Sequence, residues 1–166
     1  MRKFIVLFVI ILFTASFTYA QKQITTFILL RHAEKGNDGT DDPDLKPEGK
    51  ERANHLAELL GKTSIDAIYS TSFKRTRDTV APLAAAKALD VQPYEAFKEE
   101  EIEKMLRKYA GGTVVISGHS NNIPWIANLL IGKEEYKDYE DSDYKNLLIV
   151  SVVEKGKVAK VTWLSY

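Results

Sequence analysis

The nine residues that decide the fold are Phe27-Ile28-Leu29-Leu30-Arg31-His32-Ala33-Glu34-Lys35. A short apolar run with strand character ends here at an arginine and a histidine, so polar side chains follow the point where a buried strand would reach the surface. In open α/β sheets, ligands bind outside the carboxyl ends of the strands. We therefore expect Arg31 and His32 to belong to a functional site.

Strand-like and helix-like segments alternate along the rest of the chain, which is typical of a parallel sheet covered by helices on both faces. The expected strands span residues 24–30, 65–69, 91–94 and 113–117, and residues 147–153 and 158–164 are expected to form a closing hairpin. The expected helices span residues 47–60, 73–89, 98–109 and 124–131, the second of them kinked or restarted at Pro82. The predicted fold class is α/β: a three-layer α/β/α sandwich with a mostly parallel central sheet and an antiparallel C-terminal edge.

The composition is that of an ordinary globular protein. Of the 166 residues, 45% are apolar and 28% are charged, so neither disorder nor a fibrous repeat is expected. There is no cysteine, which excludes disulfides, thiolate catalysis and cysteine-based zinc sites. The net charge is 0, and it becomes −2 without the first 20 residues, which hold two basic residues and no acid. This mild acidity argues against a nucleic-acid surface.

Residues 1–20 have the pattern of a secretory signal peptide. Arg2 and Lys3 precede an unbroken apolar run over residues 4–13, and a small residue, Ala20, ends the segment. The run is too short for a comfortable membrane span. We expect cleavage near Ala20 and export to the periplasm or the extracellular space, with no stable membrane anchor afterwards. An uncleaved anchor or a strand of the fold is the alternative.

Three strand ends supply residue types that bind phosphate. Arg31 and His32 follow the first strand, Arg75 begins the helix after the second, and His119 follows the buried strand at 113–117. Because the carboxyl ends of parallel strands lie at one edge of a sheet, these side chains are expected to form a compact cationic pocket. Guanidinium groups bind phosphate oxygens in pairs, and a neutral imidazole held among them can attack phosphorus.

The segment after His119 is a second source of anion binding. Ser120 and Asn121 lie just before the expected helix, where free backbone N–H groups and the helix dipole favour a negative charge. We therefore expect Ser120 and Asn121 to bind the phosphate together with Arg31, Arg75 and His119.

Three motifs follow one another along the chain. They are Leu30-Arg31-His32-Ala33-Glu34, then Tyr69-Ser70-Thr71-Ser72 with Arg75-Thr76-Arg77-Asp78-Thr79, then Ser117-Gly118-His119-Ser120-Asn121. Together they closely resemble the histidine phosphatase superfamily, also called the phosphoglycerate mutase-like family, in the order that family uses. The resemblance implies a small single domain of this kind over residues 21–166. It also implies a metal-independent phosphatase without a cofactor, which hydrolyses a phosphomonoester or a phosphoramidate.

The resemblance implies a role for each matching position. His32 would be the phosphorylated nucleophile, Arg31 and Arg75 would bind the phosphoryl group, and His119 would contact it from the opposite side and stabilise the transition state. Arg77 lies two residues along a helix from Arg75 and cannot face the same way, so we expect it to be structural or at the rim.

The general acid is a separate question, because breaking a phosphate ester leaves an alkoxide that needs a proton. Members of the family that act on esters place a carboxylic acid between the second and third motifs. Glu95 is the best candidate there, with Asp90, Glu99 and Glu100 as alternatives. Members that cleave phosphohistidine, whose imidazole departs readily, manage without a dedicated acid.

Other functions remain as alternatives at this point. One is a non-catalytic phosphate-binding module of the same fold, and another is a phosphotransferase of the phosphoglycerate mutase type, although mutases of the family are longer. A metal site built on the histidines would need carboxylate ligands that no spacing here supplies. The expected partner is a small phosphorylated substrate or a phosphohistidine protein, and nothing in the sequence indicates an oligomeric state.

Overall fold

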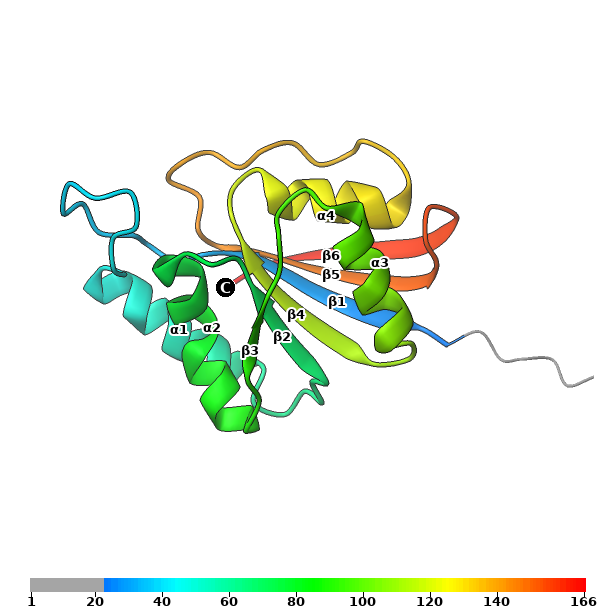
Figure 1. Cartoon of the computed structure of the whole chain (residues 1–166), viewed down its shortest axis with the longest axis horizontal. Helices are drawn as coiled ribbons and strands as arrows, with labels where there is room; N and C mark the ends of the chain where they lie inside the picture. Colours follow the sequence, from blue (N-terminus) through cyan, green and yellow to red (C-terminus); the bar gives the residue numbers. More distant parts are fainter. Residues whose placement is uncertain (1–22) are drawn as a thin grey trace, which may run out of the picture.

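The computed structural model describes residues 23–166, which form a six-stranded sheet of order β3-β2-β4-β1-β5-β6 (Figure 1). The strands are β1 (Thr25–Arg31), β2 (Ala67–Ser70), β3 (Val91–Pro93), β4 (Thr113–Gly118), β5 (Asn146–Glu154) and β6 (Val158–Ser165). The strands β1, β2, β3 and β4 are joined by parallel pairs. β5 pairs antiparallel with β1, and β6 pairs antiparallel with β5. The expected mostly parallel sheet with an antiparallel C-terminal edge is confirmed. The predicted signal peptide, residues 1–20, lies outside the described residues.

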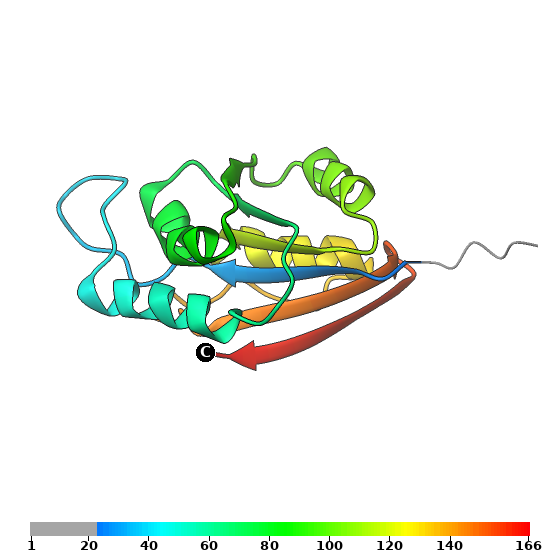
Figure 2. The same cartoon turned by 90° about the horizontal axis from the view of Figure 1, so that it is seen from below.

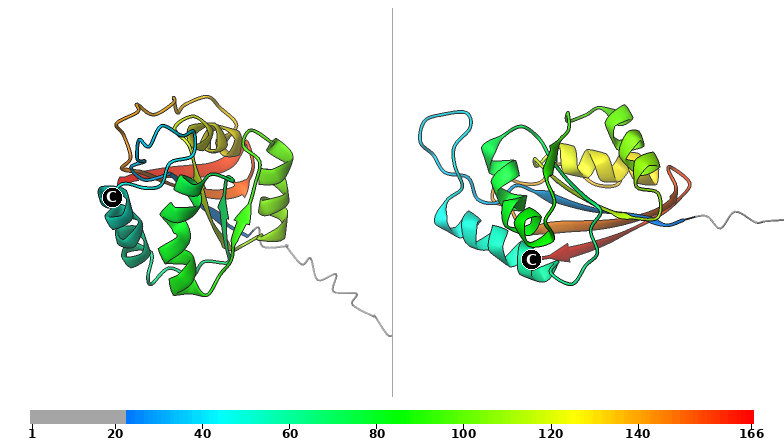
Figure 3. Two further views of the ribbon diagram at one scale, coloured as in Figure 1. Left: turned by 60° about the vertical axis from the view of Figure 1, so that its left-hand side comes forward. Right: turned by 60° about the horizontal axis from the view of Figure 1, so that its bottom comes forward.

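In the part of the chain that the structure describes, four helices cover the two faces of the sheet (Figure 3). They are α1 (Pro47–Leu59), α2 (Lys74–Lys87), α3 (Glu99–Lys108) and α4 (Asn122–Ile131). α1 and α2 lie side by side over one face, and α3 and α4 pack over the other. Within residues 23–166, no helix is long and apolar enough to cross a bilayer.

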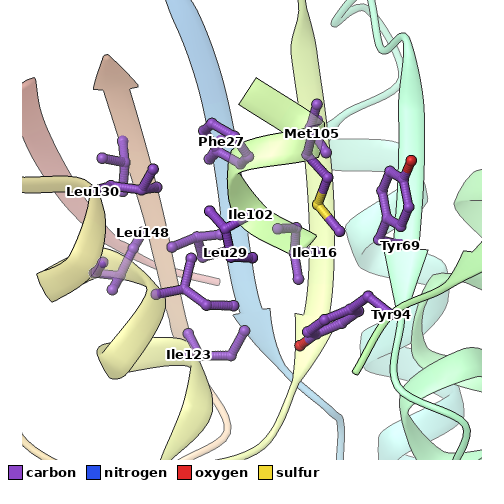
Figure 4. Close-up of a cluster of buried hydrophobic side chains, with 14 of the residues drawn as sticks. Phe27, Leu29, Tyr69, Tyr94, Ile102, Met105, Ile116, Ile123, Leu130 and Leu148 are labelled. Atoms are coloured by element: carbon purple, nitrogen blue, oxygen red, sulfur yellow. The ribbon is translucent and has the colours of Figure 1, made fainter. Parts of the chain in front are cut away.

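The side chains of β1 alternate between the two layers, because successive residues of a strand point to opposite faces. Phe27 and Leu29 belong to the core shared with α3 and α4, which Figure 4 shows, whereas Ile28 and Leu30 belong to the core shared with α1 and α2. All four side chains are buried. Burying each contributes about 1.5–3 kcal/mol, so the strand that leads into the first motif is held from both sides.

Two helices differ from their predicted form. We expected Pro82 either to kink or to restart this helix; α2 runs through Pro82 as one helix, so the restart is wrong. The buried residues Val80 and Leu83 anchor α2 on the sheet on either side of this proline, and packing outweighs one missing backbone hydrogen bond. α4 begins at Asn122 rather than at residue 124, because the chain turns into the helix directly after His119.

The topology places four strand ends at one edge of the sheet. Arg31 of β1 pairs with Gly118 of β4, and Ser70 of β2 pairs with both Ser117 of β4 and Pro93 of β3. The loop at residues 36–45 projects from the end of the molecule at which β1 ends, as Figures 1 and 2 show. A ligand at this edge would therefore meet residues from four separate segments of the chain.

Candidate active site

Two histidines from neighbouring strands lie beside each other at this edge. His32 follows β1 and His119 follows β4, and the His32 amide donates to the Gly118 carbonyl at 2.8 Å. The centroids of the two imidazole rings are 5.5 Å apart, and the ring planes meet at 67°. The parallel pairing of β1 with β4 thus brings the first and third motifs into contact.

His32 is held with one ring nitrogen free. Its Nδ1 lies 2.8 Å from the Ala33 carbonyl oxygen, which can only accept, so Nδ1 carries the proton. Nε2 has no hydrogen-bond partner among residues 23–166. Burial lowers the pKa of His32 to about 3, with Arg31 acting in the same direction and the hydrogen bond to Ala33 opposing. The imidazole is therefore neutral at physiological pH, as a nucleophile must be.

The His119 ring is oriented by a chain of hydroxyl groups. Its Nε2 lies 3.0 Å from Oγ1 of Thr71, which in turn lies 2.9 Å from Oγ1 of Thr76. This leaves Nδ1 of His119 without a partner among the described residues. Burial lowers the pKa of His119 to about 4, and the charges of Arg75 and Arg31 contribute in the same direction. Both histidines of the pair are therefore neutral near pH 7.

The backbone of His119 is fixed by a buried asparagine. The His119 amide donates to Oδ1 of Asn122, and Nδ2 of Asn122 donates to the Tyr94 hydroxyl at 2.7 Å. A Cβ at Gly118 would lie 2.5 Å from Oδ1 of Asn122 and 2.7 Å from the Tyr94 hydroxyl oxygen. Only glycine fits at this position, so the third motif needs Gly118 for its packing.

Two arginines border the histidine pair, and each has a buried donor without a partner in residues 23–166. Nη1 of Arg31, whose side chain is 3% exposed, donates to the carbonyl oxygens of Glu140 and Asp143 at 2.8 and 3.0 Å. Nη1 of Arg75 donates to the carbonyl oxygen of Asp41 at 3.1 Å. Nε of both arginines is buried and has no acceptor among the described residues. An unpaired buried donor costs about 1–3 kcal/mol, and an anion that accepted from both would remove that cost.

Aromatic rings hold the two guanidinium groups. Cζ of Arg31 lies 4.4 Å from the ring centroid of Tyr144, and Cζ of Arg75 lies 4.2 Å from that of Phe73. The Phe73 ring is also 5.1 Å from the His119 ring, edge to face. These contacts limit where each guanidinium can move, so the cations are positioned before a ligand arrives.

Three of the predicted site residues make their hydrogen bonds or ion pairs with partners outside this cluster, or are exposed to solvent. Ser120 contributes a carbonyl that accepts from the Tyr139 amide at 3.0 Å, and Asn121 is exposed. The side chain of Glu95 is 72% exposed and forms its ion pair with Lys98. None of these three side chains has a hydrogen bond or an ion pair to the two histidines or two arginines among residues 23–166.

The acidic residue of the first motif has a structural partner. Nε of Arg52 on α1 donates to both carboxylate oxygens of Glu34 at 3.0 Å, and Nη2 donates to Oε1 at 2.7 Å. Nη1 of Arg52 donates to the backbone oxygen of Tyr166 at 2.6 Å. Against the opposing effect of burial, the Arg52 guanidinium lowers the pKa of Glu34. This pair ties the chain after His32 to α1 and to the residue after β6.

Several residues at the site were not assigned a role from the sequence. Thr71 stands in the second motif, and its place at a strand end was a usable signal. Asn122 is one position beyond the predicted Ser120 and Asn121. Tyr144 lies after an acidic loop without any motif, so no local pattern could have indicated its contact with Arg31.

The assembled groups fit one class of chemistry. An unprotonated imidazole nitrogen, a second neutral imidazole and two guanidinium groups suit attack on phosphorus with the phosphoryl oxygens held by the cations. Within residues 23–166, no three side chains of His, Cys, Asp or Glu come close enough together to hold a metal ion.

Comparison with known proteins points the same way. A model described as the histidine phosphatase superfamily (branch 1) matches residues 27–105, a range that contains Arg31, His32 and Arg75. Phosphoserine phosphatase 1 of Hydrogenobacter thermophilus is 35% identical over 96 residues, which cover 49% of this chain and 46% of that protein. The chain therefore spans about half the length of the curated relative that it matches.

Solved structures resemble the whole fold. The protein histidine phosphatase SixA in complex with tungstate gives a TM-score of 0.69 at 14% identity, over 84% of this chain and 96% of that one. A phosphoserine phosphatase mutant from Entamoeba histolytica, in complex with phosphoserine, gives a TM-score of 0.65 at 16% identity, over 83% and 95% of the two chains. At these identities the likeness establishes the fold, in which β4 and His119 take part although they lie beyond the matched range.

Proposed function

The chain belongs to the histidine phosphatase superfamily (branch 1), and we propose that it hydrolyses a phosphomonoester or a phosphoramidate through a phosphohistidine on His32. One observation carries the proposal: Nε2 of His32 is unprotonated and has no hydrogen-bond partner among residues 23–166, in a buried site that also holds Arg31, Arg75 and His119. The reaction has two steps that share this nitrogen.

In the first step, Nε2 of His32 forms a bond to phosphorus while the bond to the leaving group breaks. Nε of Arg31 and Nε of Arg75 donate hydrogen bonds to the phosphoryl oxygens. The imidazole ring of His119, which lies beside that of His32, faces the same phosphoryl group. In the second step, water attacks phosphorus, and the electron pair of the P–N bond returns to Nε2. The hydrogen bond from Nδ1 to the Ala33 carbonyl stabilises the positive charge that the ring carries while it is phosphorylated.

The proposed substrate classes are a small phosphorylated molecule and a phosphohistidine protein. The relatives named above include a phosphoserine phosphatase and a protein histidine phosphatase. Specificity in enzymes of this kind resides in loops around the shared phosphate site. Here, the segment at 36–45 supplies Asp41 to Arg75, and the segment at 132–145 supplies Glu140 and Asp143 to Arg31.

The test is incubation of the protein from residue 21 onward with an aryl phosphate. We expect release of inorganic phosphate at the same rate with and without a chelator, because the proposed nucleophile is a side-chain nitrogen. Phosphate binding without turnover of any ester or phosphoramidate would favour the non-catalytic module. Isomerisation of a phosphoglycerate without phosphate release would favour the mutase, and sensitivity to the chelator would favour metal chemistry.

We also propose that the protein is exported and cleaved near Ala20. The support is the basic start, the apolar run over residues 4–13 and the small residue at the end of the segment. In a bacterial host with a secretion system, we expect the exported form to begin at Gln21 and to lack the first 20 residues by mass spectrometry. An intact N-terminus on a membrane-bound product would contradict cleavage and favour an uncleaved anchor.

A further inference from the structure

Cleavage of an ester requires a proton donor for the leaving oxygen, and the carboxyl groups around the site are not equivalent. Glu34 accepts its hydrogen bonds from Arg52, and the side chain of Glu95 is 72% exposed and forms its ion pair with Lys98. Asp141 comes within 3.8 Å of Nη2 of Arg31, but its side chain is fully exposed. These positions leave the loop at 36–45 as the source of a carboxyl group at the phosphate-binding arginines.

Asp42 of this loop is held at Arg75 by two kinds of contact. Its Oδ1 accepts a hydrogen bond at 2.9 Å from the amide of Lys74, the first residue of α2, and lies 3.6 Å from Nη1 of Arg75. The side chain is 37% exposed, so it borders both the cation and solvent. The Asp42 charge also acts on His119, whose pKa it raises against the larger effects of burial and the arginines. A second oxygen, Oδ2, has no hydrogen-bond partner among the described residues.

From this geometry we propose that Asp42 is the general acid and base of ester hydrolysis, an inference that rests on the proposed function. A phosphate monoanion brings one proton into the site. Its phosphoryl oxygens replace Asp42 as the partner of the Arg75 guanidinium, and the Asp42 carboxylate then accepts this proton. A carboxyl group beside an anion binds a proton more tightly than one beside a cation. Substrate binding thereby converts Asp42 from an ion-pair partner into a proton donor.

The proton and electron pairs balance over the two steps. In the first, the bond from phosphorus to Nε2 of His32 forms, the P–O bond to the leaving group breaks, and its electron pair stays on the leaving oxygen, which takes the proton from Asp42. In the second, the oxygen of water bonds to phosphorus, a proton of that water passes to the Asp42 carboxylate, and the P–N electron pair returns to Nε2. Asp42 ends as it began and releases its proton with the phosphate product.

The dependence on the leaving group tests this role. Phenyl phosphate has a poor leaving group that needs protonation, whereas 2,4-dinitrophenyl phosphate has a good one that does not. For Asp42→Asn we expect kcat/KM with phenyl phosphate to fall about 100-fold, the lower end of general acid catalysis, and kcat/KM with the dinitrophenyl ester to change by less than about 3-fold. Asparagine keeps the oxygen that accepts from the Lys74 amide, so the loop contact is preserved.

Asp44→Asn is the matched control, because Asp44 lies in the same loop, is exposed and has a carboxylate that pairs with the side chain of Lys74. We expect unchanged kcat/KM for both esters. The inference is overturned if Asp42→Asn affects both esters equally or neither, or if Glu95→Gln produces the leaving-group-dependent loss instead. Failure of the proposed function looks different: the wild type would then turn over neither ester, whatever residue stands at position 42.

Discussion

Replacement of His32 by alanine is expected to lower kcat for an aryl phosphate by about 10⁴-fold or more, because the substitution removes the atom that forms the covalent intermediate. In the wild type, reactions quenched without acid should show one added phosphoryl group by mass spectrometry, located on His32. The fold should survive, since the hydrogen bond from the His32 backbone amide to the Gly118 carbonyl does not depend on the side chain.

His55→Ala is the matched control for this experiment. His55 lies on α1 with a side chain that is 58% exposed, as its place on the helix predicts, and it should leave turnover unchanged. If the phosphoryl adduct is never found, or is found equally when alanine occupies position 32, then His32 is not the nucleophile and the proposed mechanism is wrong.

Arg31→Ala is expected to lower kcat/KM by about 10²- to 10³-fold, the range typical for loss of a group that stabilises transition-state charge. It should also lower the free energy of unfolding, by about 1–3 kcal/mol, because the carbonyl oxygens of Glu140 and Asp143 lose the donor that they share. Urea unfolding and steady-state kinetics on one preparation measure both effects.

Arg31→Lys separates charge from geometry. Lysine keeps the positive charge but lacks the planar guanidinium that can donate to two carbonyl oxygens and to an anion at once. We therefore expect Arg31→Lys to recover only a small part of the lost activity. Arg77→Ala is the control, since Arg77 is exposed on α2 and should affect neither measurement. Full activity in Arg31→Lys would mean that Arg31 acts as a simple point charge.

The sheet and the meeting of the first and third motifs could be predicted from the sequence, because both depend on local patterns and one topological rule. Apolar runs at 27–30 and 114–116 mark strands buried on both faces, and alternation with helices implies parallel pairing. Once the pairing is parallel, His32 and His119 must lie at the same edge. The expected limits of the elements lie within two residues of the observed ones, and the largest differences are at the starts of β2 and α4 and at the end of α2.

The contacts that complete the site could not be predicted, because they join segments whose spacing carries no periodic signal. Asp42 meets Arg75 through a turn-rich loop, and Tyr144 meets Arg31 through a loop between α4 and β5. The Glu34 pair with Arg52 depends on how α1 is placed against the chain after β1. Side chains on loops are positioned by the tertiary structure as a whole, which no window of sequence describes.

The hydrogen bonds from Arg31 to the segment at 132–145, which follows α4, have an evolutionary consequence. Nη1 of Arg31 donates to the main-chain carbonyl oxygens of Glu140 and Asp143. Every amino acid has such a carbonyl, so these two hydrogen bonds do not depend on the side chains at positions 140 and 143. Relatives could therefore carry other side chains at positions 140 and 143 and still keep both carbonyls hydrogen-bonded to the same guanidinium. One unchanged phosphate-binding site could therefore be surrounded by loops of different sequence, each suited to a different substrate.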